Sequence, residues 1–342
     1  MKIKTISFPS VLEPAFGNTE NSAHDLLNGL KIKHRLNWYI VGNLAKTGGV
    51  NATRIINAAP TEDDFEILLK TALVIASQNK QNPLTITMGF PFSTYNIYKG
   101  SIEQLLAKRN FLIEFDTQTF NAGGNIKKAM VEIEKFDIIP EIVGSIIGLK
   151  NIYGQKGASG SFVVISLGFG TMEGAMASKT GLVQRTVFST FGIRYAINNF
   201  SRELNKQYYL SLQNEYQLDD AFVNGYITIN RKKIDLSSLK KEILTQYYRA
   251  VISPAIRKYI TDNDFQNCET IYLVGGGSNY QDLADCFNEE FQDIITVTVP
   301  PQPENVTSTG YLYNTLRINS NNGEGAIGLD LGNSSTVISM TE

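Results

Sequence analysis

The sequence has few of the residues that build disulfide frameworks, zinc sites or histidine-based catalytic centres. Its 342 residues include two cysteines, Cys268 and Cys286, and two histidines, His24 and His34. Two cysteines exclude a disulfide-rich scaffold and a cysteine-rich zinc site. Two histidines leave little material for a histidine metal centre or for a Ser-His-Asp triad.

Charge of one sign and long apolar runs are also lacking. Lys and Arg (31) nearly balance Asp and Glu (33), so no overall basic field indicates direct binding to nucleic acid. No apolar run approaches the roughly 20 residues of a membrane-spanning helix, and Met1–Ser10 lacks the apolar stretch of a signal peptide. We therefore expect a cytoplasmic protein that contacts neither nucleic acid nor membrane directly.

The chain does have enough apolar sequence for two domains. Hydrophobic residues make up 42% of it, and its length exceeds that of one typical domain. Strand-like and helix-like segments alternate, which predicts α/β layers. Strands are predicted at Lys2–Phe8, Leu84–Met88, Ser161–Leu167, Thr270–Val274, Ile294–Val299 and Ala326–Leu331. Helices are predicted at Thr61–Gln78, Gly192–Gln207 and Ser237–Ile260, the last kinked at Pro254, and linkers at Asn279–Asp282 and Asn319–Glu324.

The most informative feature is an internal repeat. Residues 162–176 read FVVISLGFGTMEGAM, and residues 326–340 read AIGLDLGNSSTVISM. Each copy has an apolar strand, a Leu-Gly turn with small residues and a second strand-like run, which predicts a β-hairpin whose turn exposes backbone N–H groups. Such turns suit a polyphosphate because they allow close backbone approach. Two copies indicate two half-domains that offer a turn to the same ligand.

Three further features fit a phosphate site, and each has a plain structural alternative. Asp330 ends its strand, where its carboxylate could hold hydrated Mg2+ or simply face solvent. Gly275–Gly277 follows a strand and could approach a ring or a phosphate, or form only a tight turn. Glu141 follows Pro140 at the start of a predicted helix, Glu141–Leu149, where it could polarise an attacking water or only complement the helix dipole.

Together, the two hairpins, the glycine triplet and the Pro-Glu helix start resemble the nucleotide signature of the actin, heat-shock-chaperone and sugar-kinase superfamily. The nearest likeness is to bacterial and archaeal actin-like proteins of the ParM type. Phe8–Ser10 and Gly89–Phe92 resemble parts of their first domain, and Asn305–Thr315 resembles their second connecting helix, with Gly310 at a close-packed position. The resemblance implies an α/β fold of two related actin-like (ribonuclease-H-like) domains with a nucleotide cleft between them.

The order of the motifs departs from that family. There the first phosphate loop opens the chain, whereas its match here, Asp330–Thr336, closes it. A circular permutation explains this order if the first hairpin is cut beyond its phosphate turn and the former ends are joined through Asn319–Glu324. The expected domains are then residues 1–157 plus 308–342, and residues 158–307.

The resemblance also implies roles for individual residues. Asp330 would organise Mg2+ through water, Glu141 would position the hydrolytic water, and ATP or GTP would be the nucleotide. The residues implied to contact the nucleotide are Gly332, Asn333 and Ser334 in the first turn, Gly168, Phe169, Gly170 and Thr171 in the second, and Gly275, Gly276 and Gly277 beside the adenosine.

Ser166 is the main departure from the family pattern at this site. It stands where active members usually carry Asp, and its neutral hydroxyl brings no charge to Mg2+. Phe169 adds bulk to the second turn, and Glu173 follows at the family's later acidic position. Loss of one such carboxylate typically costs about 10–100-fold in metal affinity or activity. Nucleotide binding is therefore expected to survive better than hydrolysis.

The resulting expectation is a weak actin-like ATPase that self-associates into filaments with ATP-Mg2+. Its implied role is cytoskeletal or in plasmid segregation, through a DNA-binding adaptor protein. The alternatives are a non-polymerising nucleotide-binding scaffold, which Ser166 favours, and a small-molecule kinase of the same superfamily. The basic segments Arg231–Lys233 and Lys240–Lys241 are expected to be solvated surface.

Overall fold

The structure is a computed structural model that describes residues 1–15, 25–49, 52–56, 58–117, 126–157, 160–208, 215–320 and 322–342. Its contacts divide the chain into two compact units. Unit 1 comprises Met1–Gly157 and Asn305–Glu342, and unit 2 comprises Ala158–Glu304. Among the helices of the described ranges, none combines the length and hydropathy of a membrane span.

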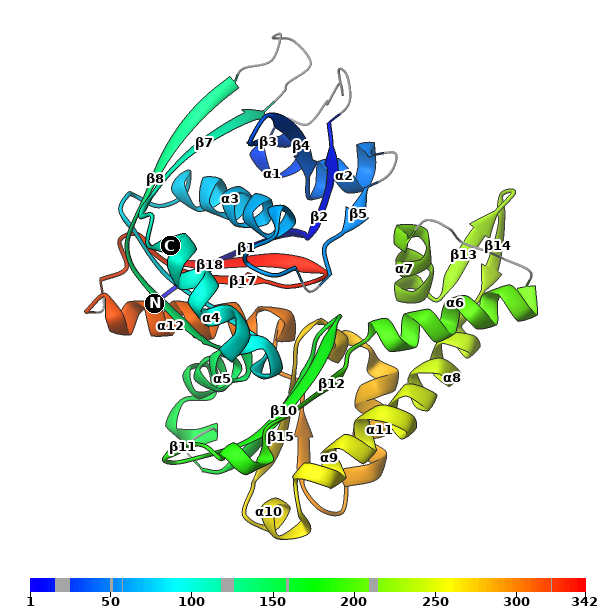
Figure 1. Ribbon diagram of the computed structural model, residues 1–342. Coiled ribbons are helices and arrows are strands. Elements are labelled where there is room, and N and C mark those ends of the chain that lie inside the picture. Colours follow the sequence, from blue (N-terminus) through cyan, green and yellow to red (C-terminus); the bar gives the residue numbers. More distant parts are fainter. Residues whose placement is uncertain are drawn as a thin grey trace. The chain divides into compact units, whose positions relative to one another are not determined.

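Unit 1 is built on a sheet of ten described strands in the order β1-β18-β17-β6-β8-β7-β3-β4-β2-β5 (Figure 1). The strands are β1 (Ile3–Pro9), β2 (Val11–Pro14), β3 (Leu30–His34), β4 (Asn37–Val41), β5 (Thr53–Arg54), β6 (Leu84–Phe90), β7 (Asn110–Thr117), β8 (Ile126–Pro140), β17 (Ala326–Leu331) and β18 (Ser335–Thr341). The central strands β17, β6 and β8 are parallel, whereas the strands on both sides of them are antiparallel to their neighbours. The carboxyl ends of the three parallel strands therefore meet at one edge of the sheet.

The helices of unit 1 cover this sheet. They are α1 (Leu26–Gly29), α2 (Asn43–Gly48), α3 (Asp63–Ser77), α4 (Phe92–Leu106), α5 (Glu141–Gly157) and α12 (Val306–Ile318). In α3, Asp63, Asp64 and Glu66 occupy the first turn, where negative charge complements the helix dipole. Phe65 and Leu69 of the same helix belong to the hydrophobic core against the sheet.

Glycine residues set the close packing of α5 against α12. A Cβ atom on Gly310 would overlap the carbonyl oxygen of Gly144, and one on Gly148 would overlap the carbonyl oxygen of Val306. The hydroxyls of Ser145 and Thr307 form a buried hydrogen bond of 2.8 Å across the same contact. A side chain is thus excluded at positions 310 and 148, and the expected close-packed position of Gly310 is confirmed.

Unit 2 contains a six-stranded sheet in the order β11-β10-β9-β15-β16, with β12 also paired to β10. Its strands are β9 (Phe162–Leu167), β10 (Thr171–Ser178), β11 (Gly181–Leu182), β12 (Phe188–Phe191), β15 (Thr270–Val274) and β16 (Thr296–Thr298), and β13 (Tyr226–Ile229) and β14 (Lys232–Asp235) form a separate hairpin. Its helices are α6 (Arg194–Tyr208), α7 (Glu215–Asn224), α8 (Ser237–Tyr247), α9 (Ser253–Tyr259), α10 (Asp262–Gln266) and α11 (Gln281–Phe291). Ile165 and Leu167 of β9 pack with Phe200 of α6 in the core of this unit.

One local prediction needs correction. The linker predicted at Asn279–Asp282 is wrong, because Asn279 ends a 3-10 turn, Gly276–Asn279, and Gln281 begins α11. Tyr280 between them packs edge-on against Phe222 at 5.4 Å, so this short polar segment is held by the core. The helix predicted at Ser237–Ile260 is confirmed as one continuous helical run, in which a π-helical turn, Tyr248–Ile252, joins α8 to α9. The wider turn precedes Pro254, which has no N–H to donate.

The linker predicted at Asn319–Glu324 lies between α12 and β17, and its residue 321 lies outside the described residues. The Asn319 side-chain amide donates to the carbonyl oxygens of Asn322 at 3.1 Å and of Glu324 at 3.4 Å. The Asn319 side chain thus links the two ends of this segment.

The two units repeat one hairpin with the same register. Leu167 pairs with Met172 as Leu331 pairs with Thr336. The pairing continues in step along both hairpins, to Val163–Met176 in unit 2 and to Ile327–Met340 in unit 1. The repeat read from residues 162–176 and 326–340 is therefore a structural repeat, and both segments form the predicted hairpins.

The neighbouring strands repeat as well. In both units the second strand of the hairpin pairs with an antiparallel third strand, β12 or β1, and the first strand pairs with a parallel fourth strand, β15 or β6. In unit 2 these strands follow one another along the chain as β9, β10, β12 and β15. In unit 1 the strands at the corresponding positions are β17, β18, β1 and β6 (Figure 1). The C-terminal hairpin of the chain therefore holds the positions that come first in unit 2, and the N-terminal strand β1 holds the next one.

Gly310→Ala tests the helix crossing. We expect it to lower the free energy of unfolding of unit 1 by about 3 kcal/mol, because the added methyl group displaces the α5 backbone. Gly100→Ala, in α4, is the matched control. No atom lies within 4 Å of its Cβ position, so the better helix former should raise stability by about 0.5–1 kcal/mol. Urea denaturation measures both, and equal effects would contradict this account of the crossing.

Candidate functional site

The turn between β17 and β18 is clamped from the end of β1. The backbone N–H of Ser10 donates to the carbonyl oxygen of Ser334 at 3.1 Å. The Ser10 hydroxyl donates to the carbonyl oxygen of Gly332 at 2.5 Å and lies 3.0 Å from the hydroxyl of Thr336. Ser10 is fully buried. The turn Gly332–Ser334 is therefore held by a residue from the opposite end of the chain.

Ser10 is the site residue whose contact sequence reasoning missed. Its segment, Phe8–Ser10, was noted only as a resemblance. The partners of its hydroxyl lie more than 300 positions away in the sequence, and no local pattern encodes such a contact. The available signal was the resemblance of Phe8–Ser10 to the family's first domain, which names no partner for the hydroxyl.

Asp330 lies near the end of β17, directly before this turn. It shares a sheet face with Gly328, on which α12 packs so closely that a Cβ atom would overlap the carbonyl oxygen of Ser308. One Asp330 carboxylate oxygen is 4.0 Å from the Cβ position of Gly332. Burial raises the pKa of the Asp330 carboxyl above its ordinary value. A cation bound beside such a carboxyl stabilises its charged form.

The turn between β9 and β10 is seated on the start of α6. The N–H of Gly168 donates to the carbonyl oxygen of Thr171 at 3.0 Å, which closes the turn, and the N–H of Arg194 donates to the carbonyl oxygen of Phe169 at 2.9 Å. The N–H of Gly192 donates to the carbonyl oxygen of Gly170 at 3.1 Å. This bond matches the one from Ser10 to Ser334, so the same clamp occurs in both units.

Residue 192 has to be glycine for the second turn to pack against the start of α6. A Cβ atom on Gly192 would lie 2.5 Å from the carbonyl oxygen of Gly168 and 2.6 Å from that of Phe169. The Phe169 side chain packs against the core of unit 2. The Phe169 ring, which was expected to crowd the second turn, is thus at least partly accommodated by this core.

Ser166 occupies the position in β9 that Asp330 occupies in β17, since both are one residue before the Leu of the Leu-Gly turn and pair with matched partners. It is buried and pairs with Glu173 across the hairpin. Glu173 is 1% exposed, and its Oε1 accepts a hydrogen bond of 2.9 Å from the Ser189 hydroxyl. The first strand of the second hairpin therefore carries no charge at this level.

The glycine triplet follows β15, beside the second turn. Gly275 has a φ of +84°, which favours glycine, and a Cβ atom there would lie 2.8 Å from the carbonyl oxygen of Leu167. Gly277 packs against the side chains of Ile193 and Leu167. Gly276 is exposed, and no atom lies within 4 Å of its Cβ position. Gly275 and Gly277 thus allow the loop to pack closely against Leu167 of β9, whereas the space beside Gly276 is open.

Glu141 is the first residue of α5 and is partly buried. It directly follows Pro140, which pairs with Phe90 in the parallel ladder of β8 and β6. Since β17, β6 and β8 are parallel neighbours, Glu141 and Asp330 lie at the same edge of the sheet, two strands or about 10 Å apart. Unit 1 thus brings together Asp330, Glu141 and the first turn, and unit 2 brings together Ser166, the second turn and Gly275–Gly277.

A metal at this edge would have to rely on few protein ligands. Across the described ranges, no group of three or more His, Cys, Asp or Glu residues could hold a metal ion. Mg2+ usually keeps several waters and binds proteins through one or two carboxylates together with substrate phosphates. One carboxylate beside a glycine-containing turn fits that chemistry.

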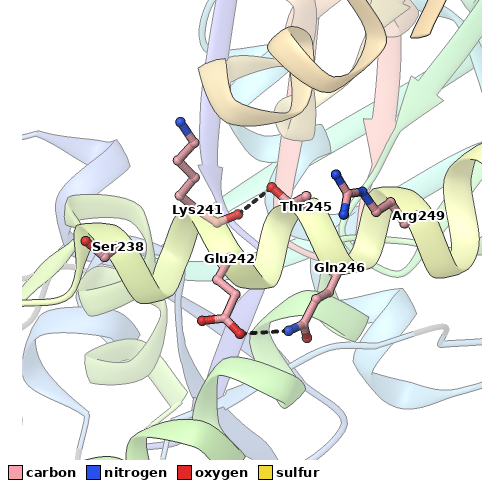
Figure 2. A pocket seen from close by; sticks show the side chains of 6 residues that line it. All are labelled: Ser238, Lys241, Glu242, Thr245, Gln246 and Arg249. Atoms are coloured by element: carbon pink, nitrogen blue, oxygen red, sulfur yellow. Dashed lines mark hydrogen bonds between the residues drawn. The ribbon is translucent and has the colours of Figure 1, made fainter. Parts of the chain in front are cut away.

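A surface hollow of about 490 Å³ lies elsewhere, along α8 of unit 2 (Figure 2). Its lining residues are Ser238, Lys241, Glu242, Thr245, Gln246 and Arg249. Two hydrogen bonds within the helix hold part of this face, from Gln246 to Glu242 at 2.9 Å and from Thr245 to the carbonyl oxygen of Lys241 at 2.9 Å. None of the glycine-turn residues lines it, so it is separate from the candidate site.

This fold, with two matched glycine turns, is that of the actin-like proteins. Residues 1–144 match the sequence family described as actin-like proteins N-terminal domain. The archaeal actin homolog Ta0583 superposes with a TM-score of 0.71 at 19% identity, over 91% of this chain and 92% of that one. A ParM subunit from a 15-stranded filament of Clostridium botulinum superposes with a TM-score of 0.70 at 18% identity, over 91% and 92%. No curated protein sequence matches the chain.

Asp330→Asn tests the burial of the carboxylate in the nucleotide-free protein. A raised pKa means that the folded state binds the proton more tightly than the unfolded state does. Wild-type stability should therefore fall as the pH rises from about 4 through the raised pKa. The Asn variant cannot ionise and should not show this loss. Thermal melts at pH 5 and pH 8 measure the difference, and a difference that does not grow with pH would contradict the assignment.

Proposed function

We propose that this chain is an actin-like nucleotide-binding protein that assembles into filaments with ATP-Mg2+ and hydrolyses the nucleotide slowly. The observation that carries the proposal is the matched pair of glycine turns, which have one register and one backbone clamp. Exposed N–H groups of such turns bind phosphate oxygens. Two copies fit a ligand with several phosphates.

In this proposal each unit contributes different chemistry. Asp330 would hold hydrated Mg2+ through water, and Gly332, Asn333 and Ser334 would present the first phosphate turn. Bound Mg2+ would neutralise charge on the phosphate oxygens. Glu141 would position the attacking water. From unit 2, Gly168, Phe169, Gly170 and Thr171 present the second turn, and Gly275–Gly277 leave room for the adenosine.

Solved relatives support the ligand and the assembly. Ta0583 has also been solved in complex with ADP, and that structure superposes with a TM-score of 0.68 at 19% identity, over 92% of each chain. The ParM protein noted above forms a 15-stranded filament. A contact between unlike surfaces that repeats without closing produces a fibre. A cytoskeletal or plasmid-segregation role, with a DNA-binding adaptor protein, rests on analogy of fold alone.

We further propose that the chain is circularly permuted relative to this family, with domains at residues 1–157 plus 308–342 and at residues 158–307. The support is the strand order of unit 1. Its strands β17, β18 and β1 take the positions of β9, β10 and β12 in unit 2, but only in unit 2 do the three strands follow one another in chain order. The joined former ends would lie in the turn at residues 319–324.

A non-polymerising nucleotide-binding scaffold is the second candidate. Ser166 favours it, because this position carries no charge in unit 2 while Asp330 carries it in unit 1. The scaffold and the filament protein both bind nucleotide, and they differ in assembly. A small-molecule kinase lacks specific support from the described residues.

Sedimentation with and without ATP-Mg2+, followed by electron microscopy of the pellet, tests assembly. We expect filaments with ATP-Mg2+ and monomer without it. Asp330→Ala should abolish ATP-dependent assembly and phosphate release, because Mg2+ loses its protein carboxylate. Wild-type protein that stays monomeric with ATP-Mg2+ bound would favour the scaffold over the filament protein.

Relinking the chain tests the permutation. Thr341 pairs with Ile3, and the N–H of Glu342 donates to the carbonyl oxygen of Lys2 at 3.1 Å, so a loop of about two to four residues can join Glu342 to Met1. The variant is opened within residues 319–324, which gives unit 1 the strand order of unit 2. We expect it to fold and to bind ATP like the original chain, whereas failure to fold would argue against the permutation.

A further inference from the structure

Phe191 is a large apolar side chain that the fold leaves exposed beside the second turn. It ends β12, and 65% of its surface is exposed, although phenylalanine is usually buried. Phe191 pairs directly with Thr171, the first residue of β10. Residues paired in this way project from the same face of a sheet, with Cβ atoms about 5 Å apart. The ring therefore lies next to the turn Gly168–Thr171.

Phe191 projects from the face of the hairpin that carries Ser166. Side chains two residues apart along a strand share a face, so Phe191 shares one with Ser189. Ser189 pairs with Glu173 and hydrogen-bonds to its carboxylate, and Glu173 pairs with Ser166. Ser166 holds the position that Asp330 holds in unit 1. The exposed ring is thus on the same side of the sheet as the position that matches the magnesium candidate.

Three contacts hold Phe191 in place. The hydroxyl of Tyr247, in α8, donates to the carbonyl oxygen of Phe191 at 2.7 Å. The Phe191 ring stacks on the ring of Tyr195, in α6, with centroids 5.9 Å apart and planes inclined by 25°. Tyr195 in turn lies 5.8 Å from the Tyr247 ring and packs against the core. The Phe191 ring is therefore supported from the core, while most of its surface is open.

The glycine triplet lies on a segment that neighbours Phe191. The side chain of Ile193, two residues after Phe191, is 2.8 Å from the Cβ position of Gly277. The space beside Gly276 is open. A flat ring bound next to the second turn can therefore have the triplet on one side and an aromatic face on another.

We propose that Phe191 is a binding residue of the nucleotide site and that its ring stacks on the base of the bound nucleotide. This inference rests on the nucleotide site proposed above. Every base has an aromatic face, and stacking on a protein ring contributes to binding without reading the edge of the base. A ring that Tyr195 and Tyr247 already hold loses little further freedom on binding. The stack therefore favours ATP and GTP alike over a ligand that has phosphates and no base.

Two competing explanations give the ring no part in binding the base. Single exposed apolar side chains are common on proteins, so Phe191 could serve only to cover Tyr195. Alternatively, the ring contacts a second copy of the chain in a filament. Inorganic tripolyphosphate with Mg2+ separates these explanations from ours, because it offers phosphates to both turns but has no base.

The experiment measures the dissociation constants of ATP, GTP and tripolyphosphate by calorimetry, each with Mg2+. For Phe191→Ala we expect the affinity for ATP and for GTP to fall about 10–100-fold, with the affinity for tripolyphosphate unchanged. Phe191→Tyr keeps the ring and should bind all three as wild type does. Ile294→Ala is the matched control. It removes an exposed apolar side chain after α11, outside the aromatic group, and should behave as wild type.

Two results with Phe191→Ala would overturn the inference and leave the nucleotide site standing. Equal losses for ATP and tripolyphosphate would mean that Phe191 only supports the turn. Unchanged affinity for ATP would assign the ring to another contact, and loss of ATP-dependent sedimentation in the same variant would identify that contact as self-association. Wild-type protein that binds neither ATP nor tripolyphosphate would overturn the site as well.

A fluorescence measurement tests the stack without removing the ring. Trp38 is the single tryptophan of the chain, so Phe191→Trp combined with Trp38→Phe leaves one tryptophan, at the proposed stacking position. A stacked base should quench its emission. We expect ATP to quench more strongly than tripolyphosphate does, and equal quenching by the two ligands would contradict the stack. This variant decides if Phe191→Ala does not fold.

Discussion

Both candidate phosphate turns depend on one backbone hydrogen bond, from the residue that follows the third strand to a carbonyl oxygen within the turn. In unit 2 this donor is Gly192, and in unit 1 it is Ser10, each at 3.1 Å from its acceptor. The bond ties the turn to the third strand of the sheet. In unit 1 donor and acceptor come from opposite ends of the sequence. The first turn therefore acquires its shape only after the N-terminal strand has paired with the C-terminal hairpin.

The two units share a backbone and differ in the side chains placed on it. At the matched level, unit 1 has an acid on the first strand and unit 2 has one on the second. Ser10 adds a hydroxyl clamp in unit 1, whereas the steric fit at Gly192 allows no side chain in unit 2. The two units therefore offer different groups to a ligand. Unit 1 carries Asp330, the candidate for organising Mg2+, and unit 2 carries the glycine triplet Gly275–Gly277.

Where local patterns were strong, the sequence predicted the fold closely. The strands Thr270–Val274 and Ala326–Leu331 appear with the predicted limits, because each is a mainly apolar segment followed directly by glycine. The repeat was predicted from its matching sequence pattern, and the close-packed position of Gly310 from the family resemblance. The antiparallel extension from β7 to β5 was not predicted, because the ladders that join β3 to β7, β4 to β2 and β2 to β5 connect segments that are distant in the chain. The polar residues of Asn279–Asp282 led to a wrong prediction of a linker there, because Tyr280 packs against the core.

The candidate site could be predicted only in part. Its glycines and acids stand out in the sequence, but the clamp of Ser10 and the pairing of Ser166 with Glu173 follow from register, which the sequence does not display. The central claim is that both turns bind the phosphates of one nucleotide. Amide hydrogen exchange with and without ATP-Mg2+ measures this directly, in peptides that cover residues 168–171 and 332–335. The account predicts slower exchange in both turns, whereas protection of one turn alone, or of neither, would contradict it.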